Sequence, residues 1–224
     1  MNFFNNVFNL AVWMNFLYVF PILLISVALH EFAHCWVVYR LGDPSPKAEG
    51  RITLNPLAHL DPLGTIMMVV TVISGWGLGW GRPTPMNPGN FRNPARDRMI
   101  SALVGPLSNV LQMFGWASLL LLLYGIFGHA LPDIIHNICW AGVWVNGFLA
   151  AFNLIPIYPL DGHHILSYFA PPAWRPIIDH PAWIAVFYAL VFVPILFQYV
   201  LSPILIPLQT AIMSLNQFVF GVSL

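Results

Sequence analysis

The chain has 224 residues and no net formal charge, and 58% of its residues are hydrophobic while only 7% are charged. A typical soluble domain carries about 25% charged residues, so the composition excludes an ordinary soluble protein and indicates a polytopic membrane protein. The even charge balance also argues against nucleic acid as a partner, because no basic surface is available for it. The two cysteines, Cys35 and Cys139, lie in apolar segments and provide no disulfide framework.

Four segments are long and apolar enough to cross a hydrocarbon core of about 30 Å. They cover residues 16–40, 99–128, 134–160 and 182–222. Prolines interrupt the last segment, which favours two short or kinked helices there over one long span. We therefore expect an all-α polytopic membrane protein with about five to six transmembrane helices. A single membrane-embedded domain would then occupy residues 1–224, with C-terminal helices in 182–222.

A fifth apolar stretch, residues 62–80, has an ambiguous pattern. Its first half is typical of a helix, but glycines in its second half disfavour one. These glycines are Gly75, Gly77 and Gly79. The stretch is therefore either an ordinary transmembrane helix or a helical half over 62–74 followed by an extended return.

The distribution of Lys and Arg favours the second alternative. Basic residues occur in 40–51, 82–98 and 161–181, whereas the loop at 128–133 has none. The positive-inside rule then puts all three basic segments on the cytoplasmic side. The chain between the first two must enter and leave on that side, so we expect a membrane-dipping hairpin or a short β-strand element between the first two full spans. Non-helical backbone at membrane depth is tolerated where it lines a cavity.

A metal-binding pattern lies inside the first predicted span. His30, Glu31 and His34 form an H-E-x-x-H motif within an apolar run that Arg40 closes. On a helix, His30 and His34 share one face and can both contact one ion, and Glu31 can reach a water bound to that ion. His30 is about 15 Å from Arg40 along a helix, near the middle of a membrane. Ionisable groups at that depth are costly, so they indicate a functional site.

A catalytic zinc usually has three protein ligands and one open position. Asp161 is the best candidate for the third ligand, because it ends an apolar run that Pro156 and Pro159 break. The other acidic residues lie in polar connections or in the loop at 128–133. The alternative is that Asp161 is a turn aspartate before Gly162.

Together these motifs resemble the site-2 protease family of intramembrane zinc metalloproteases. HEFAH at 30–34 pairs with NLIPIYPLDG at 153–162, which is similar to the family's N-x-x-P-x-x-x-L-D-G pattern. Segments 41–65 and 79–94 and the GPLSN at 105–109 resemble short bacterial members, so the core motifs cover about residues 20–170. The resemblance implies a minimal form without a PDZ or CBS domain, located in a bacterial cell membrane with its active site open to the cytoplasm.

The resemblance also implies residue roles. His30, His34 and Asp161 would hold one catalytic zinc ion, Glu31 would be the general base, and Asn153 would hold substrate or the developing oxyanion. An equal candidate role for Asn153 is to bridge broken backbone. The chain departs from many members after LDG, where it has His163 and His164. These two, and His59 from the hairpin, are either regulatory ligands, groups that orient ligands, or plain loop histidines.

A substrate helix must unwind before its peptide bonds can be cleaved, and an extended enzyme segment can then pair with it by strand addition. The candidate segment is the proline-rich return at 79–88, whose usable backbone groups lie on an edge. The residues expected to contact substrate are Gly81, Arg82, Pro83, Thr84, Pro85, Met86 and Asn87. The alternative is a proline-stiffened loop.

The expected function is therefore hydrolysis of a peptide bond within or near a transmembrane segment of a substrate protein. The expected partners are that transmembrane substrate and the lipid bilayer, while the sequence does not indicate an oligomeric state. Two other classes remain open. Intramembrane histidines and acids also mark ion paths, so a divalent-metal transporter is one alternative. A non-catalytic binder of membrane helices is the other.

Overall fold

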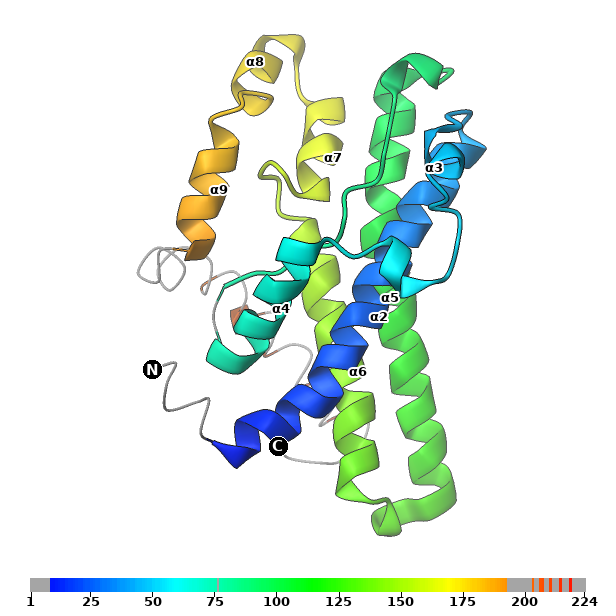
Figure 1. Cartoon of the computed structure of the whole chain (residues 1–224), viewed down its shortest axis with the longest axis vertical. Coiled ribbons are helices and arrows are strands. Elements are labelled where there is room, and N and C mark those ends of the chain that lie inside the picture. Colours follow the sequence, from blue (N-terminus) through cyan, green and yellow to red (C-terminus); the bar gives the residue numbers. More distant parts are fainter. Residues whose placement is uncertain are drawn as a thin grey trace.

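The computed structural model describes residues 9–75 and 77–192, together with the single positions 203, 206, 207, 210, 214 and 218. Three long helices lie side by side in it (Figure 1): α2 (Leu10–Arg40), α5 (Pro94–Phe127) and α6 (Asp133–Asn153). Within this described part, these three are long and apolar enough to cross a membrane. The chain is thus a largely helical membrane protein, as the composition predicted.

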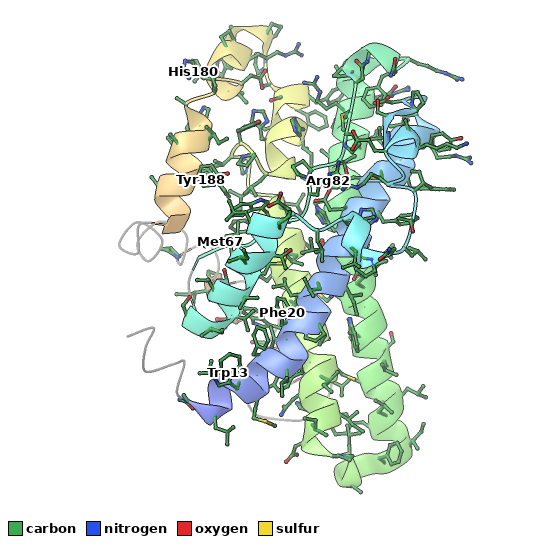
Figure 2. The ribbon with its side chains drawn as sticks, viewed as in Figure 1. Trp13, Phe20, Met67, Arg82, His180 and Tyr188 are labelled. Atoms are coloured by element: carbon green, nitrogen blue, oxygen red, sulfur yellow. The ribbon has the colours of Figure 1, made fainter. Side chains whose placement is uncertain are left out.

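The three long helices pack through small and aromatic side chains. Ile22, Ala141 and Val145 form a buried cluster, and Trp116 of α5 packs against it. Gly142 lets the ring of Trp116 approach the backbone of α6, because a Cβ atom there would overlap the indole. Close approach at small residues is how helices associate where lipid competes for apolar contacts. Many large apolar side chains face outwards (Figure 2), for example Trp13, whose side chain is 39% exposed on the lower part of α2.

The third span breaks where the prolines predicted it would. α6 ends at Asn153, turns occupy residues 154–160, and α7 (Asp161–Phe169) begins at the aspartate. Beyond α7 lie a 3-10 turn η4 (Pro172–Trp174) and two helices, α8 (Arg175–Ile178) and α9 (Trp183–Phe192). The predicted C-terminal helices over 182–222 fall mostly outside the described residues, and so does their contribution to the five to six spans.

Between α2 and α5 the chain forms several short elements. They are α3 (Ser45–Ala48), η1 (Pro56–Ala58), α4 (Pro62–Ser74) and η2 (Pro88–Asn90); a last 3-10 turn, η3 (Gly128–Ala130), joins α5 to α6. The helix expected over 62–74 is α4. Its 13 residues reach only about 20 Å, less than the roughly 30 Å of a hydrocarbon core. Gly75 ends it with φ of 75°, a left-handed conformation that glycine adopts without strain.

The chain then returns along residues 77–88, the return limb. The expected β-strand is limited here to one antiparallel bridge between Leu60 and Gly81. The N–H of Arg82 donates to the carbonyl of His59 at 2.8 Å. Pro83 and Pro85 follow at once, and because proline has no N–H the ladder cannot continue. Among the described residues, the expected β-strand is therefore reduced to this one bridge.

Two buried charges hold the return limb against the end of α2. The guanidinium of Arg51, only 1% exposed, donates to the carbonyls of Arg82 at 2.7 Å and Pro83 at 3.3 Å. The carboxylate of Asp43 accepts from the N–H of Asn87 at 2.6 Å. Burial alone would raise the pKa of Asp43, but hydrogen bonds from Ser45, Asn87 and Asn90 hold that pKa below its usual range. The limb is thus fixed by charged groups because its own backbone cannot form a sheet.

Candidate metal centre and active site

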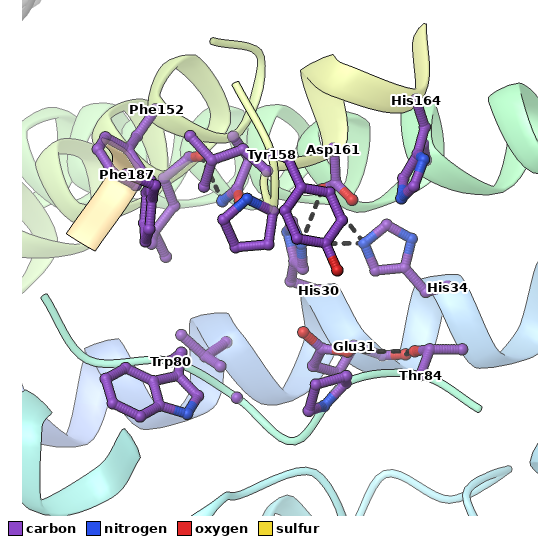
Figure 3. Close-up of a pocket in the computed structure, with 18 of the residues that line it drawn as sticks. His30, Glu31, His34, Trp80, Thr84, Phe152, Tyr158, Asp161, His164 and Phe187 are labelled. Atoms are coloured by element: carbon purple, nitrogen blue, oxygen red, sulfur yellow. Dashed lines mark hydrogen bonds and ion pairs between the residues drawn. The ribbon is translucent and has the colours of Figure 1, made fainter. Parts of the chain in front are cut away.

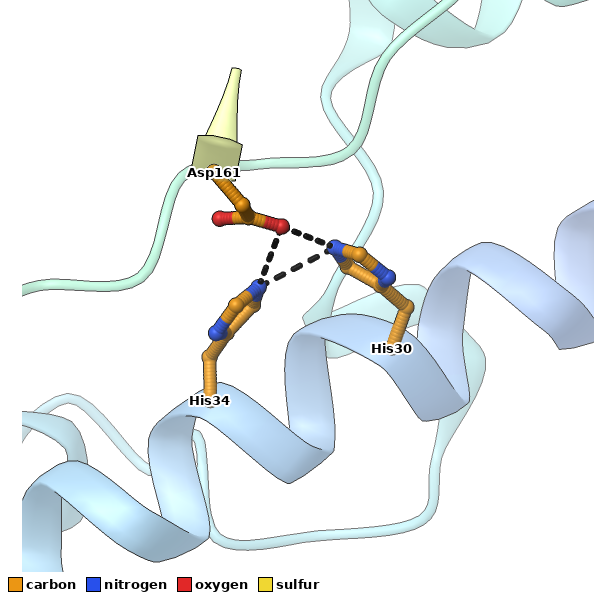
Figure 4. A group of neighbouring side chains, drawn as sticks. All are labelled: His30, His34 and Asp161. Carbon is orange, nitrogen blue, oxygen red and sulfur yellow. Dashed lines mark hydrogen bonds and ion pairs between the residues drawn. The ribbon is translucent and has the colours of Figure 1, made fainter. Parts of the chain in front are cut away.

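The two histidines of the H-E-x-x-H motif lie one turn apart on α2 and turn their Nε2 atoms towards one point (Figure 4). These two nitrogens are 3.0 Å apart. Oδ2 of Asp161 lies 3.2 Å from Nε2 of His30 and 3.3 Å from Nε2 of His34. Among the described residues, this group is the one whose His and Asp side chains could hold a metal ion. The spacing on α2 and the break after α6 therefore bring the three predicted ligands together.

Both imidazoles are held by hydrogen bonds at their outer nitrogens. Nδ1 of His34 lies 2.7 Å from the backbone carbonyl of Ser101, and Nδ1 of His30 lies 2.6 Å from Oδ1 of Asn109. These oxygens only accept hydrogen bonds, so each histidine donates from Nδ1, and in the neutral imidazole the lone pair is then on Nε2, which faces Asp161. A hydrogen bond at the outer nitrogen is the usual way of fixing the tautomer of a metal-binding histidine.

Asp161 reaches the histidines because the backbone before it is tightly packed. It is the first residue of α7, which follows the turns after α6. A Cβ atom on Gly162 would overlap the carbonyl of Leu154, so glycine lets the two segments touch. Oδ2 of Asp161 is buried and accepts no hydrogen bond from the described residues. This oxygen therefore lies against the two histidine nitrogens.

The separations and the chemistry of these three atoms suit a divalent metal ion placed between them. The two Nε2 atoms and a carboxylate oxygen converge with separations of 3.0 to 3.3 Å, and when both Nε2 atoms carry lone pairs the three atoms repel one another unless a cation lies between them. Ligand atoms about 2.0–2.1 Å from a tetrahedral zinc ion are separated by about 3.3 Å. Two histidines and one carboxylate are also a ligand set of catalytic zinc sites, which keep a position open for water.

Glu31 lies beside this group on the opposite side from Asp161 (Figure 3). Its Oε2 accepts a hydrogen bond from the hydroxyl of Thr84 at 3.1 Å. The return limb passes directly over it, because a Cβ atom on Gly81 would lie 3.0 Å from Cγ of Glu31. The limb thus orients the carboxylate and covers one side of it.

A cavity of about 460 Å³ opens next to these groups. One wall is α2 with Val27, and another is the return limb with Trp80. Phe152 and Asn153 close it from the end of α6, and Phe187 closes it from α9. Its size is within the range of about 300–1,000 Å³ that is usual for ligand sites. The cavity therefore joins an apolar lining to one cluster of ionisable groups.

Comparisons with known proteins agree with this site. The model of peptidase family M50 matches residues 97–197. A candidate zinc metalloprotease named YwhC, from Bacillus subtilis, is 34% identical over 202 residues, which cover 88% of this chain and 90% of that protein. The chain belongs to peptidase family M50. This is the site-2 protease family that the motifs resembled.

Two further relatives of this M50 chain are candidate zinc metalloproteases named Rip2. The one from Mycolicibacterium smegmatis is 31% identical over 165 residues, which cover 71% of this chain and 60% of that protein. The one from Mycobacterium tuberculosis is 32% identical over 203 residues, which cover 89% of this chain and 68% of that protein. No solved structure matches the chain.

The remaining predicted site residues of the M50 chain divide between the cavity and its surroundings. The return limb supplies Gly81, Pro83, Thr84 and Met86 to the cavity lining. Three others lie outside that lining: Arg82 pairs with Glu49, Pro85 is half-buried, and Asn87 binds Asp43. Asn153 lines the cavity, and its Nδ2 donates to the carbonyl of Leu149 at 2.9 Å.

The three additional histidines have different surroundings. Nε2 of His59 lies 2.8 Å from the carbonyl of Thr53, and His59 is not part of the cavity lining. His163 points away from the cavity, with Nε2 3.1 Å from the carbonyl of Ile178. Only His164 lines the cavity. Figure 3 shows that the His164 ring extends from α7 towards His34.

Sequence reasoning assigned no role to several residues of α5 and α6 that surround the candidate ligands. A Cβ atom on Gly105 would overlap the imidazoles of both His30 and His34, so this glycine lets α5 approach the metal centre. Asn109 binds His30, and Asn146 binds Asn109. The asparagines in these apolar spans could have indicated such contacts, because a polar group at membrane depth is costly unless it has a partner.

We predict that Gly105→Ala lowers both zinc content and peptide cleavage. The added methyl group must displace the imidazoles or α5, and a misplacement of about 1 Å can reduce a rate by about 10²-fold. Gly115→Ala is the matched control, since it lies on the same helix and a Cβ there meets no atom within 4 Å. Zinc per chain and cleavage rate are measured for both purified variants. Equal values for the two would contradict the close approach at Gly105.

Proposed function

We propose that this chain hydrolyses a peptide bond within or near a transmembrane segment of a substrate protein, with His30, His34 and Asp161 holding one zinc ion and Glu31 acting as general base. Family M50 membership makes it a zinc metalloprotease that acts on membrane-embedded substrates. The residue roles rest mainly on one observation. The Nε2 atoms of two imidazoles and one carboxylate oxygen converge beside the carboxylate of Glu31.

Each side chain has a distinct part in this proposal. Zinc bound at this site would polarise the scissile carbonyl and lower the pKa of a water molecule. Glu31 takes the proton from that water and delivers it to the leaving amine. Thr84 holds the carboxylate of Glu31 in place by its hydrogen bond. Asn153 lines the same cavity and has a second amide hydrogen free to donate to the developing oxyanion.

We also propose that the return limb binds substrate by strand addition. The limb is extended, lines the cavity and is fixed by Arg51 and Asp43. Such anchoring lowers the ordering cost of pairing with an unwound substrate. Because Pro83 and Pro85 offer no N–H and the Pro83 carbonyl accepts from Arg51, the backbone groups of Thr84 and Met86 and the carbonyl of Pro85 would make the contacts.

We further propose that α4 and the return limb form a hairpin that dips into the membrane from the cytoplasmic side, within a single membrane-embedded domain. α4 is too short to span, and Gly81 returns beside Leu60. The ends of the molecule support this orientation. Figure 1 puts α3, α8 and the start of α5 at the end opposite η3, and basic residues occur in the former but not in the loop at 128–133. The natural location is then a cell membrane with water entering from the cytoplasm.

The test is incubation of purified protein with a panel of single-span membrane proteins, with and without a chelator, followed by readdition of zinc. We expect cleavage within or near the transmembrane segment of at least one substrate, lost with chelator and restored by zinc. The same preparation in liposomes tests for metal flux. Zinc flux without any cleavage would favour a transporter and contradict the proposal.

A further inference from the structure

Two buried asparagines link the metal centre to all three long helices. Asn109 on α5 and Asn146 on α6 are both 0% exposed, and neither lines the cavity. Nδ2 of Asn109 donates to Oδ1 of Asn146 at 3.0 Å. Amide groups buried between apolar helices are costly unless they are bonded. The proposed chemistry does not use either side chain, so their presence needs a separate explanation.

The direction of this amide chain is set at its far end by the backbone. The second amide, Asn146, meets the carbonyl of Gly142 at 2.9 Å and the hydroxyl of Ser26 on α2 at 2.9 Å. A backbone carbonyl only accepts, so Asn146 must turn its NH₂ group towards Gly142. Its carbonyl oxygen therefore faces Asn109. If the Asn146 amide were reversed, its oxygen would face the Gly142 carbonyl, which is also an acceptor. Its NH₂ group would then face the NH₂ group of Asn109, which is also a donor.

The same reasoning continues to the metal ligand. Because Asn146 presents an oxygen, Asn109 must present its NH₂ group to it, and its own oxygen then faces Nδ1 of His30 at 2.6 Å. An amide oxygen only accepts, so His30 must carry its proton on Nδ1. Neutral imidazole has one proton, and Nε2 is left with the lone pair that a metal requires. Figure 4 shows Nδ1 pointing away from Asp161 and Nε2 pointing towards it.

The second histidine reaches the same state by a shorter route. Nδ1 of His34 meets the carbonyl of Ser101 on α5 directly, at 2.7 Å. Both metal-binding histidines thus have their tautomer set by a backbone carbonyl of another helix. His34 uses one contact, whereas His30 uses two intervening amides that reach Gly142 on α6.

We propose that Asn109 and Asn146 are positioning residues that lock His30 into the tautomer able to bind zinc, with the Gly142 carbonyl setting their direction. This inference rests on the proposed role of His30 as a zinc ligand. It explains why amides, rather than hydroxyl groups, occupy these positions, because only an amide holds a fixed donor and a fixed acceptor on one planar group. It also makes zinc affinity depend on the packing of α2, α5 and α6.

The central variant is Asn109→Leu, which keeps a similar size but removes the acceptor for His30. We expect its zinc affinity to fall by about 10–100-fold, the usual effect of losing a partner that orients a metal ligand. Asn146→Leu leaves Asn109 in place but free to reverse, so a smaller fall is expected. Asn109→Asp keeps an oxygen for His30 and, when protonated, a donor for Asn146, so it should bind zinc more tightly than Asn109→Leu.

The matched control is Gln112→Leu on the same helix. The buried Nε2 of Gln112 has no hydrogen-bond partner among the described residues, so its removal should leave zinc affinity unchanged. Affinity is measured by competition with graded chelators on purified full-length protein. The visible absorption of the cobalt-substituted protein reports ligand geometry without any need for activity. Melting of the zinc-free variants separates loss of the fold from loss of the tautomer.

The outcomes separate this inference from the function on which it rests. His30→Ala with unchanged zinc affinity would remove His30 from the ligand set, and the proposed function would fail with it. If His30→Ala loses zinc but Asn109→Leu binds it as the wild type does, only the positioning role is overturned. Equal losses in Asn109→Leu and Asn109→Asp, with equal melting temperatures, would also overturn it. The expected ranking, with an altered cobalt spectrum in Asn109→Leu, supports it.

Discussion

Replacing Glu31 with Gln is expected to abolish most peptide cleavage while leaving zinc bound. The side chain keeps its size and still offers an oxygen to Thr84, which now lies 3.1 Å from the carboxylate. Gln cannot accept a proton, so general base catalysis is lost, and such catalysis contributes about 10²–10⁴-fold to a rate. The three facing ligand atoms belong to His30, His34 and Asp161, and zinc content should therefore remain near the wild-type value.

The control is Glu49→Gln, the same chemical change at the other glutamate of the chain. Glu49 forms an exposed ion pair with Arg82 at 2.9 Å, and exposed pairs contribute little to stability. Its variant should cleave substrate as the wild type does. Zinc is measured by elemental analysis, and cleavage is measured under single-turnover conditions. A Glu31→Gln variant that retains full zinc and near wild-type cleavage would show that another group is the base.

The pairing of the two histidines was predictable from the sequence because its geometry is local. A separation of four residues on a helix puts His30 and His34 on one face whatever the rest of the fold does. Asp161 was predictable for a different reason. The prolines before it break the helix, so an acidic residue at that point faces a cavity rather than lipid. The structure brings the three side chains together as these two arguments require.

The contacts that support this centre were not predictable, since they depend on how the long helices align with one another. The need for glycine at Gly105 arises only because α5 crosses α2 at the two histidines. Asn109 and Asn146 are 37 positions apart, and periodicity does not pair them. The alignment of one helix against another follows from the packing of many side chains, so it cannot be derived from the pattern of a single sequence.

The connection between α2 and α5 also differed from what its composition suggested. The sequence suggested that Asp43 and Arg51 are charged residues of a polar loop, but their exposed fractions are only 0% and 1%. The reason lies in the prolines of the return limb. Pro83 and Pro85 stop strand pairing at this point, so no neighbouring strand bonds the carbonyls of Arg82 and Pro83, and a buried guanidinium bonds them instead. The proline pattern argued against a central strand, but it did not indicate that charged side chains would bond the backbone of the limb.

Replacing Asp161 with Ala is expected to cause the largest loss of zinc. The change leaves two imidazole nitrogens 3.0 Å apart without the carboxylate oxygen that lies 3.2 and 3.3 Å from them. Two neutral ligands bind a divalent cation far less well than two with an anion. The affinity should therefore fall by more than the roughly 10–100-fold that follows loss of an outer partner. Asp161→Asn, which keeps an oxygen but no charge, should lie between Ala and the wild type.

Asp133→Asn provides the control, because Asp133 is an exposed acid in the first turn of α6, at the opposite end of that helix from Asn153 and the turns that lead to Asp161. Zinc affinity is measured by chelator competition for all three variants, and cleavage is measured at saturating zinc. If Asp161 is a ligand, excess zinc should restore part of the cleavage in Asp161→Asn. If Asp161 only caps the turn before Gly162, Asp161→Asn should bind zinc fully, because asparagine also caps turns. The distinction is sharp because α7 begins at this residue. A turn-capping role requires only a side-chain acceptor, which asparagine also has. Tight zinc binding requires the negative charge of aspartate beside the two histidine nitrogens.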